Sequence, residues 1–412
     1  LKPLLAQAAR PSARPVAAGG AGRPMEPAEA ERLASLCIPT LRAKGLSGIG
    51  AAASVQSRQV AGVWTGEGGI VEITVRGEGG ESASIIAKSI GTYKNCDNME
   101  LQDHWSYYNE AAFYETDLPD RMCAAGVHCP RPLLVERMSS GQPPHGRKRR
   151  ASTLQSSERI QSLLKRFKVL PEDDGEEKDQ AVICMTKLDG GRWGSSQAEP
   201  ALSWLARLHA LFWGAERTSA AVAAGVSDQT GFWHLDNRSI EFGRMGGGPL
   251  KLAAVGVDAR LKADAMQTLC HGDPKGANIM WDADKGVMMY DFQWFGKGPP
   301  TKDLTYFFAT AALNGRRWEQ SKEEGYLRFY HKELSSLLEA QGDKPPTFEY
   351  LYDSYRLACF DYRRWQEGGF TWGNQALLDA SVEHVLNKLG AGGKVPTTEE
   401  DYRERIFECF PP

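Results

Sequence analysis

The sequence contains no long hydrophobic run and has almost no excess of charge of either sign. Its 49 Lys and Arg residues face 52 Asp and Glu residues, which leaves a net charge of −3. A membrane-spanning helix needs about 20 consecutive apolar residues, and a protein that attracts nucleic acid by its overall field needs a strong basic excess. We therefore expect neither a membrane nor a nucleic acid as a partner.

The eight cysteines lack the C-x-x-C spacing that is typical of metal and redox motifs. Several of them, such as Cys184 and Cys270, stand in apolar surroundings. We interpret them as free thiols in a reducing compartment and not as a disulfide framework. This predicts a cytoplasmic protein.

Acidic residues are missing from residues 1–24, which are rich in Ala, Arg and Pro. This composition is typical of a transit peptide and would direct the chain to a plastid or mitochondrion. The alternative is that Met25 is the true start. Under both interpretations residues 1–24 lie outside the fold, and we assign residues 1–25 to a disordered or transit-like leader.

The most informative stretch is residues 270–308. Asn278 follows Asp273 by five positions, and Asp291-Phe292-Gln293 comes later. The apolar runs 279–281 and 287–290, separated by turn residues, predict a β-hairpin. Such a hairpin would fold Asp291 back beside Asn278 and Asp273.

Two carboxylates and a carboxamide in one place suit phosphoryl transfer. Asn278 and Asp291 offer the oxygen ligands that Mg²⁺ prefers, and Asp273 is left to accept the proton of an attacking hydroxyl. The Asp-x-x-x-x-Asn spacing is that of the kinase catalytic loop, and Asp-Phe-Gln stands where kinases carry Asp-Phe-Gly. Taken alone, the motif around Asp273 could be a plain turn, and Asp-Phe-Gln could be the end of a strand. The occurrence of both motifs in this order favours a phosphoryl-transfer site.

The segments HGDPKGAN, YDFQWFGKG and DLTYF resemble the Brenner motif of the aminoglycoside phosphotransferase and choline kinase superfamily. They are most similar to the ecdysteroid-kinase-like (CHK kinase-like) family, and the resemblance extends over most of residues 55–395. It implies a protein-kinase-like, two-lobed α+β fold with a small antiparallel β N-lobe and a mainly helical C-lobe. It also implies ATP and Mg²⁺ as cofactors.

The N-lobe is expected at residues 26–188, with strands at 51–64, 70–75 and 82–90. Between the first two strands, Gly66 and Gly68 could let backbone amides approach phosphates, although a plain hairpin turn is the alternative. Lys88 in Ile-Ile-Ala-Lys matches the strand lysine that holds the α- and β-phosphates. The family pattern gives it Glu110 as partner and leaves Glu115 facing solvent.

A buried-type strand at 181–185 leads into the expected hinge, where backbone groups near Met185 and Lys187 would face the adenine. The helical C-lobe then covers residues 189–412 and includes a helix that begins near Pro200. On it, His209 is expected to be a packing residue. Residues 215–256 give no assignable pattern.

A polar insertion is predicted at 139–180, with a possible short helix at 158–168. Arg149-Arg150-Ala151-Ser152 resembles a protein-kinase target, which makes Ser152 a candidate phosphorylation site. The basic run before it could instead be a localisation signal or an anion patch. A solvated loop is the simplest interpretation.

Five further residues have expected roles. Lys275 lies where many protein kinases place a lysine on the γ-phosphate, although many members of the family carry a bulky residue there. His271 is expected to brace the loop, and Asp303 to cap a helix or tie down the catalytic loop. On a later helix, Asp361 and Trp365 could line an acceptor cleft.

Together these features predict an ATP- and Mg²⁺-dependent phosphotransferase that acts on a hydroxyl of a small-molecule alcohol. One alternative is a choline- or ethanolamine-type kinase, since the aromatic residues of the last third could cage a cation. Another is a nucleotide-binding pseudokinase that scaffolds partners. The intact set of polar site residues argues against a pseudokinase.

Overall fold

The computed structural model describes residues 25–62, 68–90, 98–139, 179–393 and 395–412. The chain divides into two compact units. The first, called here the sheet unit, holds the described residues from Met25 to Ala124 together with those between Cys129 and Asp189. The second, the helical unit, holds Ala125–His128 and Gly190–Pro412. Gly66, the candidate Ser152 and the predicted helix at 158–168 lie outside the described residues.

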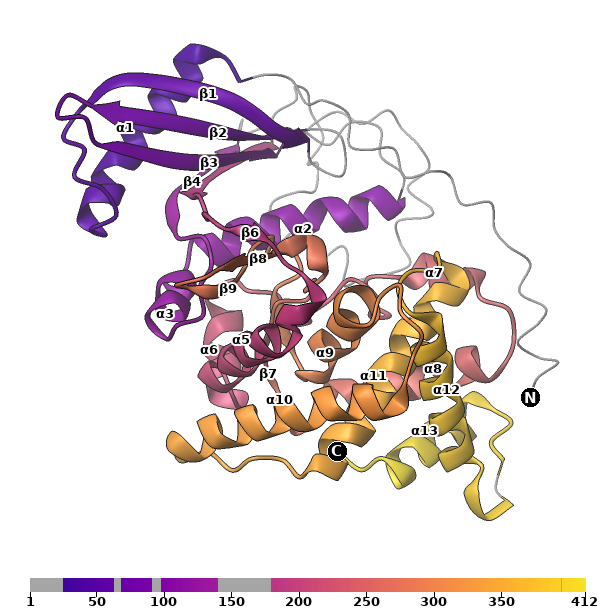
Figure 1. Ribbon diagram of the computed structural model, residues 1–412. Coiled ribbons are helices and arrows are strands. Elements are labelled where there is room, and N and C mark those ends of the chain that lie inside the picture. The colour runs from indigo at the N-terminus through magenta and orange to yellow at the C-terminus, as the bar shows by residue number, and fades with distance from the viewer. Residues whose placement is uncertain (1–24, 63–67, 91–97, 140–178, 394) are drawn as a thin grey trace, which may run out of the picture. The chain divides into compact units, whose positions relative to one another are not determined.

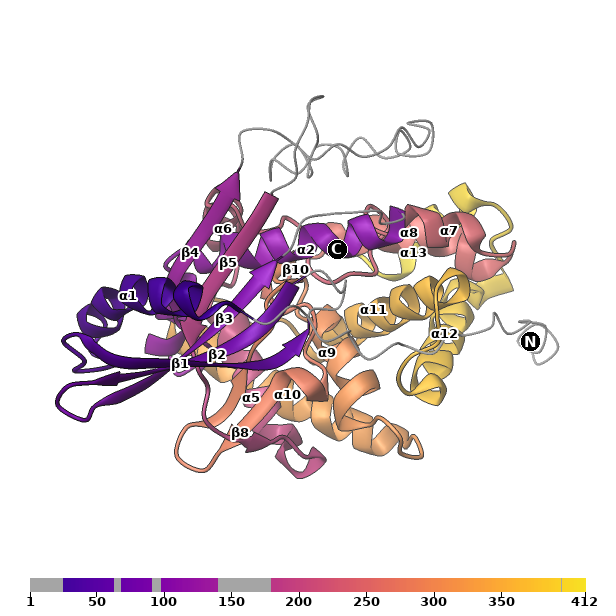
Figure 2. The ribbon, with the colours of Figure 1, turned by 90° about the horizontal axis from the view of Figure 1, so that it is seen from above.

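The sheet unit contains a five-stranded sheet in which every neighbouring pair of strands is antiparallel (Figures 1 and 2). Its spatial order is β1-β2-β3-β5-β4. The strands are β1 (Ala52–Gly62), β2 (Gly68–Gly77), β3 (Ser82–Ile90), β4 (Pro132–Ser139) and β5 (Asp179–Thr186). Alternating apolar residues such as Val71, Ile73 and Val75 in β2 are buried, as expected for strands that cover a core.

In the described part of this unit, three helices accompany the sheet: α1 (Pro27–Ala43), α2 (Asn98–Tyr114) and α3 (Leu118–Ala124). Leu33, Cys37 and Leu41 recur at helical spacing in α1 and are buried against residues of β2, β3 and β5. This apolar stripe explains why a weakly helical segment forms a stable helix, because packing of one face supplies most of a helix's stability.

The helical unit is built from nine described α-helices (Figure 1). They are α5 (Ala198–Leu211), α6 (Ala215–Ala223), α7 (Ser239–Arg244), α8 (Pro249–Lys262), α9 (Thr301–Phe307), α10 (Gln320–Ala340), α11 (Phe348–Gly368), α12 (Gln375–Leu389) and α13 (Glu399–Cys409). Three of them, α6, α7 and α8, begin within the 215–256 stretch that gave no sequence pattern. The glycines of that stretch obscured the periodicity of short helices.

Two small sheets carry the informative stretch. β8 (Ile279–Asp282) and β9 (Gly286–Met289) form the predicted hairpin, with β6 (Gly191–Arg192) beside β8. β7 (Thr268–Cys270) pairs with β10 (Gly296–Gly298). The hairpin prediction is therefore confirmed.

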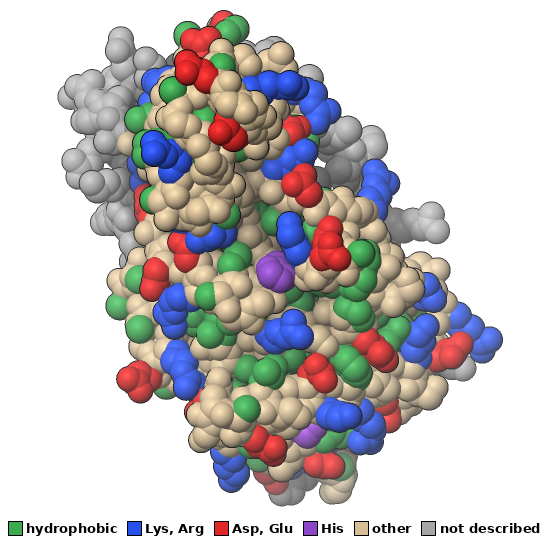
Figure 3. All heavy atoms as spheres, turned by 60° about the vertical axis from the view of Figure 1, so that its left-hand side comes forward, with side chains coloured by type: hydrophobic (Ala, Val, Ile, Leu, Met, Phe, Trp, Pro, Cys, Tyr) green, Lys and Arg blue, Asp and Glu red, His purple; other side chains and the backbone are tan. Residues whose placement is uncertain are grey.

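The predicted α+β class is confirmed, with an antiparallel sheet in the amino-terminal part and helices in the carboxy-terminal part. None of the helices that the structure describes has both the length and the apolar composition needed to cross a membrane. On the face drawn in Figure 3, acidic and basic side chains are interspersed among apolar and uncharged ones.

Candidate active site

The His-Gly-Asp loop follows β7 directly and is held by one carboxylate. Asp303, in the first turn of α9, accepts the amide protons of His271 on Oδ2 at 2.7 Å and of Gly272 on Oδ1 at 2.8 Å. Gly272 has a φ of 82°, and a Cβ at that position would lie 2.0 Å from the carbonyl oxygen of Trp294. Only glycine fits at this position with this backbone conformation, so Gly272 is required for the course of the loop.

Asp303 is itself held by His209 of α5. The His209 Nε2 atom lies 3.2 Å from Asp303 Oδ2, and its Nδ1 atom lies 2.7 Å from the Tyr330 hydroxyl. All three side chains are buried. His209 is thus a packing histidine as expected, but the sequence did not indicate that it orients Asp303.

His271 braces the loop through both ring nitrogens. The amide of Asp273 donates to Nδ1 at 3.3 Å, and Nε2 lies 3.1 Å from the carbonyl oxygen of Tyr290. An amide can only donate and a carbonyl can only accept, so the ring is neutral with its proton on Nε2. Burial lowers the pKa of His271, which agrees with this neutral state.

Asp273 is buried, and its two carboxylate oxygens differ. Oδ2 accepts from Lys275 Nζ at 2.6 Å and from Asn278 Nδ2 at 2.9 Å. Oδ1 is buried and has no hydrogen-bond partner among the described residues. Burial raises the pKa of Asp273, the charge of Lys275 lowers it and the charge of Asp291 raises it.

The β8–β9 hairpin brings Asn278 and Asp291 to the same loop. The amide of Tyr290, which precedes Asp291, donates to the Asn278 carbonyl oxygen at 3.1 Å. Because Asn278 Nδ2 donates to Asp273, its side-chain oxygen Oδ1 is the atom left for a cation. Asp291 has a φ of 71° and is the only described non-glycine residue with a positive φ. Such strained backbone is common at functional sites, and the two oxygen donors fit a hard cation such as Mg²⁺.

The sheet unit contains the expected lysine–glutamate pair. Lys88 of β3 donates to Glu110 of α2 at 2.5 Å, and both side chains are buried. Lys88 also lies over the ring of Tyr107, 5.1 Å from its centroid. Glu115 instead is exposed and pairs with Arg137 at 2.7 Å, so the structure joins Lys88 to the glutamate that the family pattern selected.

The remaining predicted nucleotide contacts lie at the ends of strands. Gly68 opens β2 with a φ of 145°. Met185 is in β5 and paired with Ile86 of β3. The Lys187 amide donates to the Ser84 carbonyl at 3.4 Å, and its ammonium lies 2.9 Å from Glu72. An adenine contact through the Lys187 amide would therefore have to replace this long hydrogen bond.

The sequence singled out Trp365 but did not predict that Tyr306 and Trp233 join it in an aromatic cluster near Asp273. Tyr306 of α9 and Tyr362 of α11 are buried, and burial together with the negative charge of Asp273 raises the pKa of both phenols. Trp233 stacks on Tyr306 with ring centroids 5.5 Å apart, and Trp365 stacks on Tyr362 at 5.8 Å. Tyr306 is part of the DLTYF motif, which could have indicated its place near the site. Trp233 lies in the stretch 215–256, which carries no assignable sequence pattern.

Trp365 belongs to this cluster, and Asp361 precedes it by four positions in α11. Asp361 Oδ1 accepts from Arg364 at 2.7 Å. Its Oδ2 atom is buried without a hydrogen-bond partner among the described residues, as is Trp365 Nε1. Buried polar atoms in this state are costly unless a ligand or water completes them, which fits the expected acceptor cleft.

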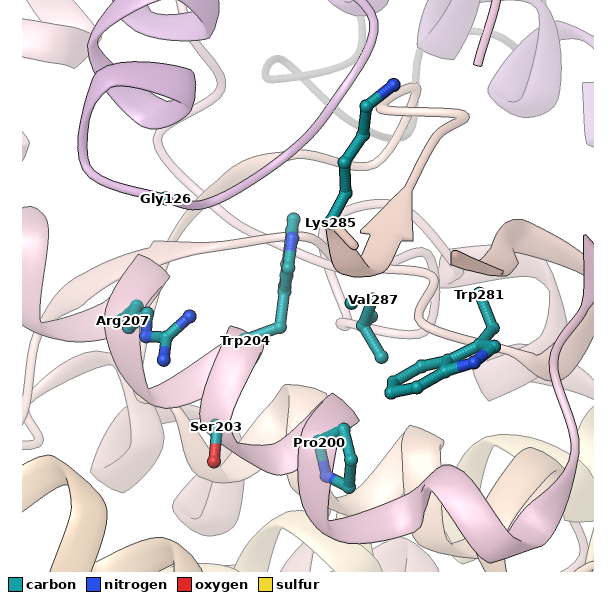
Figure 4. Close-up of a pocket in the computed structure, with 9 residues that line it drawn as sticks. Gly126, Pro200, Ser203, Trp204, Arg207, Trp281, Lys285 and Val287 are labelled. Carbon is teal, nitrogen blue, oxygen red and sulfur yellow. The ribbon is translucent and has the colours of Figure 1, made fainter. Parts of the chain in front are cut away.

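A separate cavity of about 220 Å³ lies between one face of α5 and the β8–β9 hairpin (Figure 4). Trp204 and Arg207 come from the helix, and Trp281, Lys285 and Val287 come from the hairpin. None of the predicted site residues lines it. This cavity is distinct from the loop that carries Asp273.

A family model matches the part of the chain that carries this loop. Residues 254–342 match the model of the ecdysteroid kinase-like family. No curated protein matches the chain. The solved structures that resemble it include amicoumacin kinase hAmiN in complex with AMP-PNP, Ca²⁺ and Ami (12% identity, 84% of this chain and 92% of that one, TM-score 0.41). A Plasmodium vivax ethanolamine kinase is 10% identical, over 81% of this chain and 82% of that one, with a TM-score of 0.41. The Streptococcus pneumoniae choline kinase LicA is 11% identical, over 85% of this chain and 98% of that one, with a TM-score of 0.39.

Likeness at these identities and TM-scores says nothing about the activity of this chain. The family match is different, because it covers β7, the His-Gly-Asp loop, the hairpin and α9. Those are the elements that hold Asp273, Asn278, Asp291 and Asp303. Segment 254–342 thus matches the ecdysteroid kinase-like family, the family that its motifs resemble.

Proposed function

We propose that the protein is an ATP- and Mg²⁺-dependent phosphotransferase that phosphorylates a hydroxyl of a small molecule. The observation that carries this proposal is the state of Asp273. One of its oxygens is held by Lys275 and Asn278, while the other is buried without a hydrogen-bond partner among the described residues. A carboxylate held in this way is suited to receive a proton from a ligand.

In the proposed step, Asp273 Oδ1 accepts the proton of the acceptor hydroxyl. The oxygen freed of its proton attacks the terminal phosphorus of ATP, and ADP leaves with the electrons of the broken P–O bond. Burial, which raises the pKa of Asp273, makes it a stronger base than an exposed aspartate. Lys275 and Asn278 keep the second oxygen in place during this transfer.

The other residues would serve the nucleotide. Asn278 and Asp291 would hold Mg²⁺, which when bound neutralises negative charge on the phosphates. Lys88, oriented by Glu110, would bind the phosphates, and the resemblance adds Gly66 and Gly68 near them and backbone groups of Met185 and Lys187 at the adenine. These nucleotide contacts are part of the proposal.

The aromatic cluster beside Asp273 supports a compact organic acceptor. Tyr306, Tyr362 and Trp365 offer apolar ring surface, and the unpartnered polar atoms of Asp361 and Trp365 offer a few directional contacts. This combination is typical of small-molecule sites.

The charges of the cluster favour a neutral alcohol over a choline-like cation. Asp361 is already compensated by Arg364 at 2.7 Å. Lys302 is also buried, with its ammonium 5.6 Å from the ring centroid of Trp233. A cationic acceptor would enter a region that already contains two buried cations, which is unfavourable at low local dielectric.

The direct test is transfer from Mg²⁺-ATP to a panel of neutral and cationic alcohols, with product identified by mass spectrometry. Asp273→Asn keeps the size and the hydrogen bonds but cannot take the proton, so it should lower transfer by about two to four orders of magnitude with nucleotide affinity unchanged. Asp291→Asn should instead abolish the strengthening of ATP binding by Mg²⁺ in calorimetry. If the wild type binds nucleotide and transfers phosphate to no alcohol, the pseudokinase alternative gains and the proposal fails.

A further inference from the structure

Two cysteines of the sheet unit lie in contact. Cys123 is in the last turn of α3, and Cys129 follows six positions later, after the chain turns at Gly126 with a φ of 74°. Their sulfur atoms are 3.7 Å apart. Cys123 is partly exposed, whereas Cys129 is buried, with its sulfur 3.7 Å from the carbonyl oxygen of Pro119.

We propose that Cys123 and Cys129 form a reversible disulfide, with Cys123 as the thiol that reacts first with a small-molecule disulfide such as oxidised glutathione. The sulfur atoms need to approach from 3.7 Å to the bond length of about 2.0 Å. The turn at Gly126 already brings the two side chains together, so closure asks for a local adjustment. This site is independent of the proposed phosphotransferase activity.

The two thiols differ in the way that such an exchange requires. The hydrogen bond from Cys129 lowers the pKa of Cys123 to about 7. The charge of Arg131 acts in the same direction, while burial and the charge of Asp120 oppose it. Burial raises the pKa of Cys129. The thiolate is the nucleophile in thiol–disulfide exchange, so the partly exposed Cys123 attacks and the buried Cys129 resolves.

The exchange takes two steps. The Cys123 thiolate attacks one sulfur of the oxidised glutathione, which forms a mixed disulfide and releases one glutathione as a thiolate that takes up a proton. Cys129 then loses its proton and attacks the Cys123 sulfur, which releases the second glutathione. The two protein thiols are oxidised by two electrons and one glutathione disulfide is reduced to two thiols.

The segment between the two cysteines is anchored to the hairpin that precedes Asp291. The carbonyl oxygen of His128 accepts from the Met289 amide at 3.2 Å and from Trp204 Nε1 at 3.1 Å. Met289 is the last residue of β9. A disulfide from Cys123 to Cys129 would close a ring around the segment that holds this strand.

The test exposes the reduced, folded protein to oxidised glutathione at neutral pH and maps thiols by peptide mass spectrometry. Cys96, which lies outside the described residues, is replaced by serine throughout. We expect a Cys123–Cys129 crosslink that dithiothreitol reverses. Cys129→Ser should accumulate glutathione on Cys123, and Cys123→Ser should leave Cys129 unmodified.

Other cysteines of the same chain supply the controls. Cys37 and Cys184 are also hydrogen-bonded to each other but fully buried, so they should stay reduced. Cys409 is partly exposed, and its thiol donates to the Lys388 carbonyl oxygen at 3.6 Å. Because the hydrogen bond from Cys129 favours the thiolate of Cys123, Cys123 should react with oxidised glutathione at least about ten-fold faster than Cys409.

The proposal is overturned if no Cys123–Cys129 crosslink forms in the folded protein. It is equally overturned if the crosslink appears only together with a Cys37–Cys184 crosslink, since that would report unfolding. Should a serine variant fail to fold, the rate of Cys123 relative to Cys409 in the chain with both native thiols decides the matter: equal rates refute the assignment.

Discussion

Asp303 accepts the backbone amide proton of His271 at 2.7 Å although 32 positions separate the two residues. The same carboxylate takes the amide of Gly272, so a single side chain at the start of α9 fixes the entry of the loop that carries Asp273. A hydrogen bond to a buried charged group contributes about 1.5 to 3 kcal/mol. The position of the candidate base therefore depends on a residue that does not touch the reacting atoms.

Asp303→Asn should destabilise the protein by about 2 to 3 kcal/mol. Both carboxylate oxygens of Asp303 accept hydrogen bonds, and in asparagine one of them becomes an NH₂ group, which donates. This NH₂ group would face a backbone amide or His209, so at least one buried hydrogen bond is lost. Denaturant unfolding measures this change. Asp284→Asn makes the same substitution at an exposed position in the β8–β9 turn and should change stability by less than about 0.5 kcal/mol. Equal effects of the two substitutions would contradict the role of Asp303.

Lys275→Met should move the acidic limb of the pH–rate profile to higher pH. Burial holds the pKa of Asp273 above its ordinary value, and Lys275 is the first of the charges that lower it. Transfer needs the ionised carboxylate, so activity falls as pH drops through that pKa, and removal of the lysine raises the pKa further. The measurement is kcat/KM against pH for the best acceptor.

The matched control for this experiment is Lys285→Met. Lys285 is an exposed lysine in the turn of the same hairpin, and its loss should leave the position of the limb unchanged. The decisive quantity is the pH at which kcat/KM falls and not its maximum value. A contact between Lys275 and a phosphate would change the maximum as well. An unshifted limb in Lys275→Met would show that this lysine does not tune Asp273.

Replacing residues 140–178 by Asn-Gly should leave the fold intact. Ser139 of β4 and Asp179 of β5 are direct partners in the antiparallel register, and Asn-Gly is a favoured two-residue connection between such partners. A shorter loop also costs less entropy to close, by roughly 0.6 kcal/mol for each halving of its length. We expect an unchanged or slightly higher melting temperature and no phosphorylation by a basophilic protein kinase. A large fall in melting temperature would reveal packing that the sequence did not indicate.

The elements that the sequence predicted well are those with local signals. Residues 82–90 were expected as a strand and form β3, and the catalytic hairpin follows its apolar runs and turn residues. Lys88 and Glu110 could be paired because the order of elements and a short motif selected both. In each case the information lies within a few positions of the residue concerned.

The residues that the sequence missed depend on contacts between distant segments. His209 reaches Asp303 over 94 positions, and nothing in the helix around His209 indicates that partner. Trp233 stacks on Tyr306 from a glycine-rich stretch whose short helices carry no clear period. Tertiary packing decides such contacts, so periodicity and turn chemistry cannot predict them.

The link between Asp291 and Asp303 limits the kind of acceptor that can bind. Eleven residues separate them, and β10 occupies the middle of this link. One edge of β10 pairs with β7. On the other edge, the Lys297 amide donates to Ser227 at 3.0 Å and the Lys297 carbonyl accepts from Thr230 at 2.8 Å. Both edges are thus engaged, so this segment cannot add an extended peptide as a further strand.

We therefore expect phosphate transfer to a hydroxylated metabolite and none to generic protein substrates. A cell extract incubated with the protein and γ-labelled ATP, then separated into protein and small-molecule fractions, measures this directly. Label should enter the small-molecule fraction with the wild type and not with Asp273→Asn, which removes only the proposed base. Because the Asp291–Asp303 link leaves no edge for a peptide strand, label confined to proteins would mean that the acceptor binds elsewhere and that the assignment of the aromatic cluster around Tyr306 and Tyr362 is wrong.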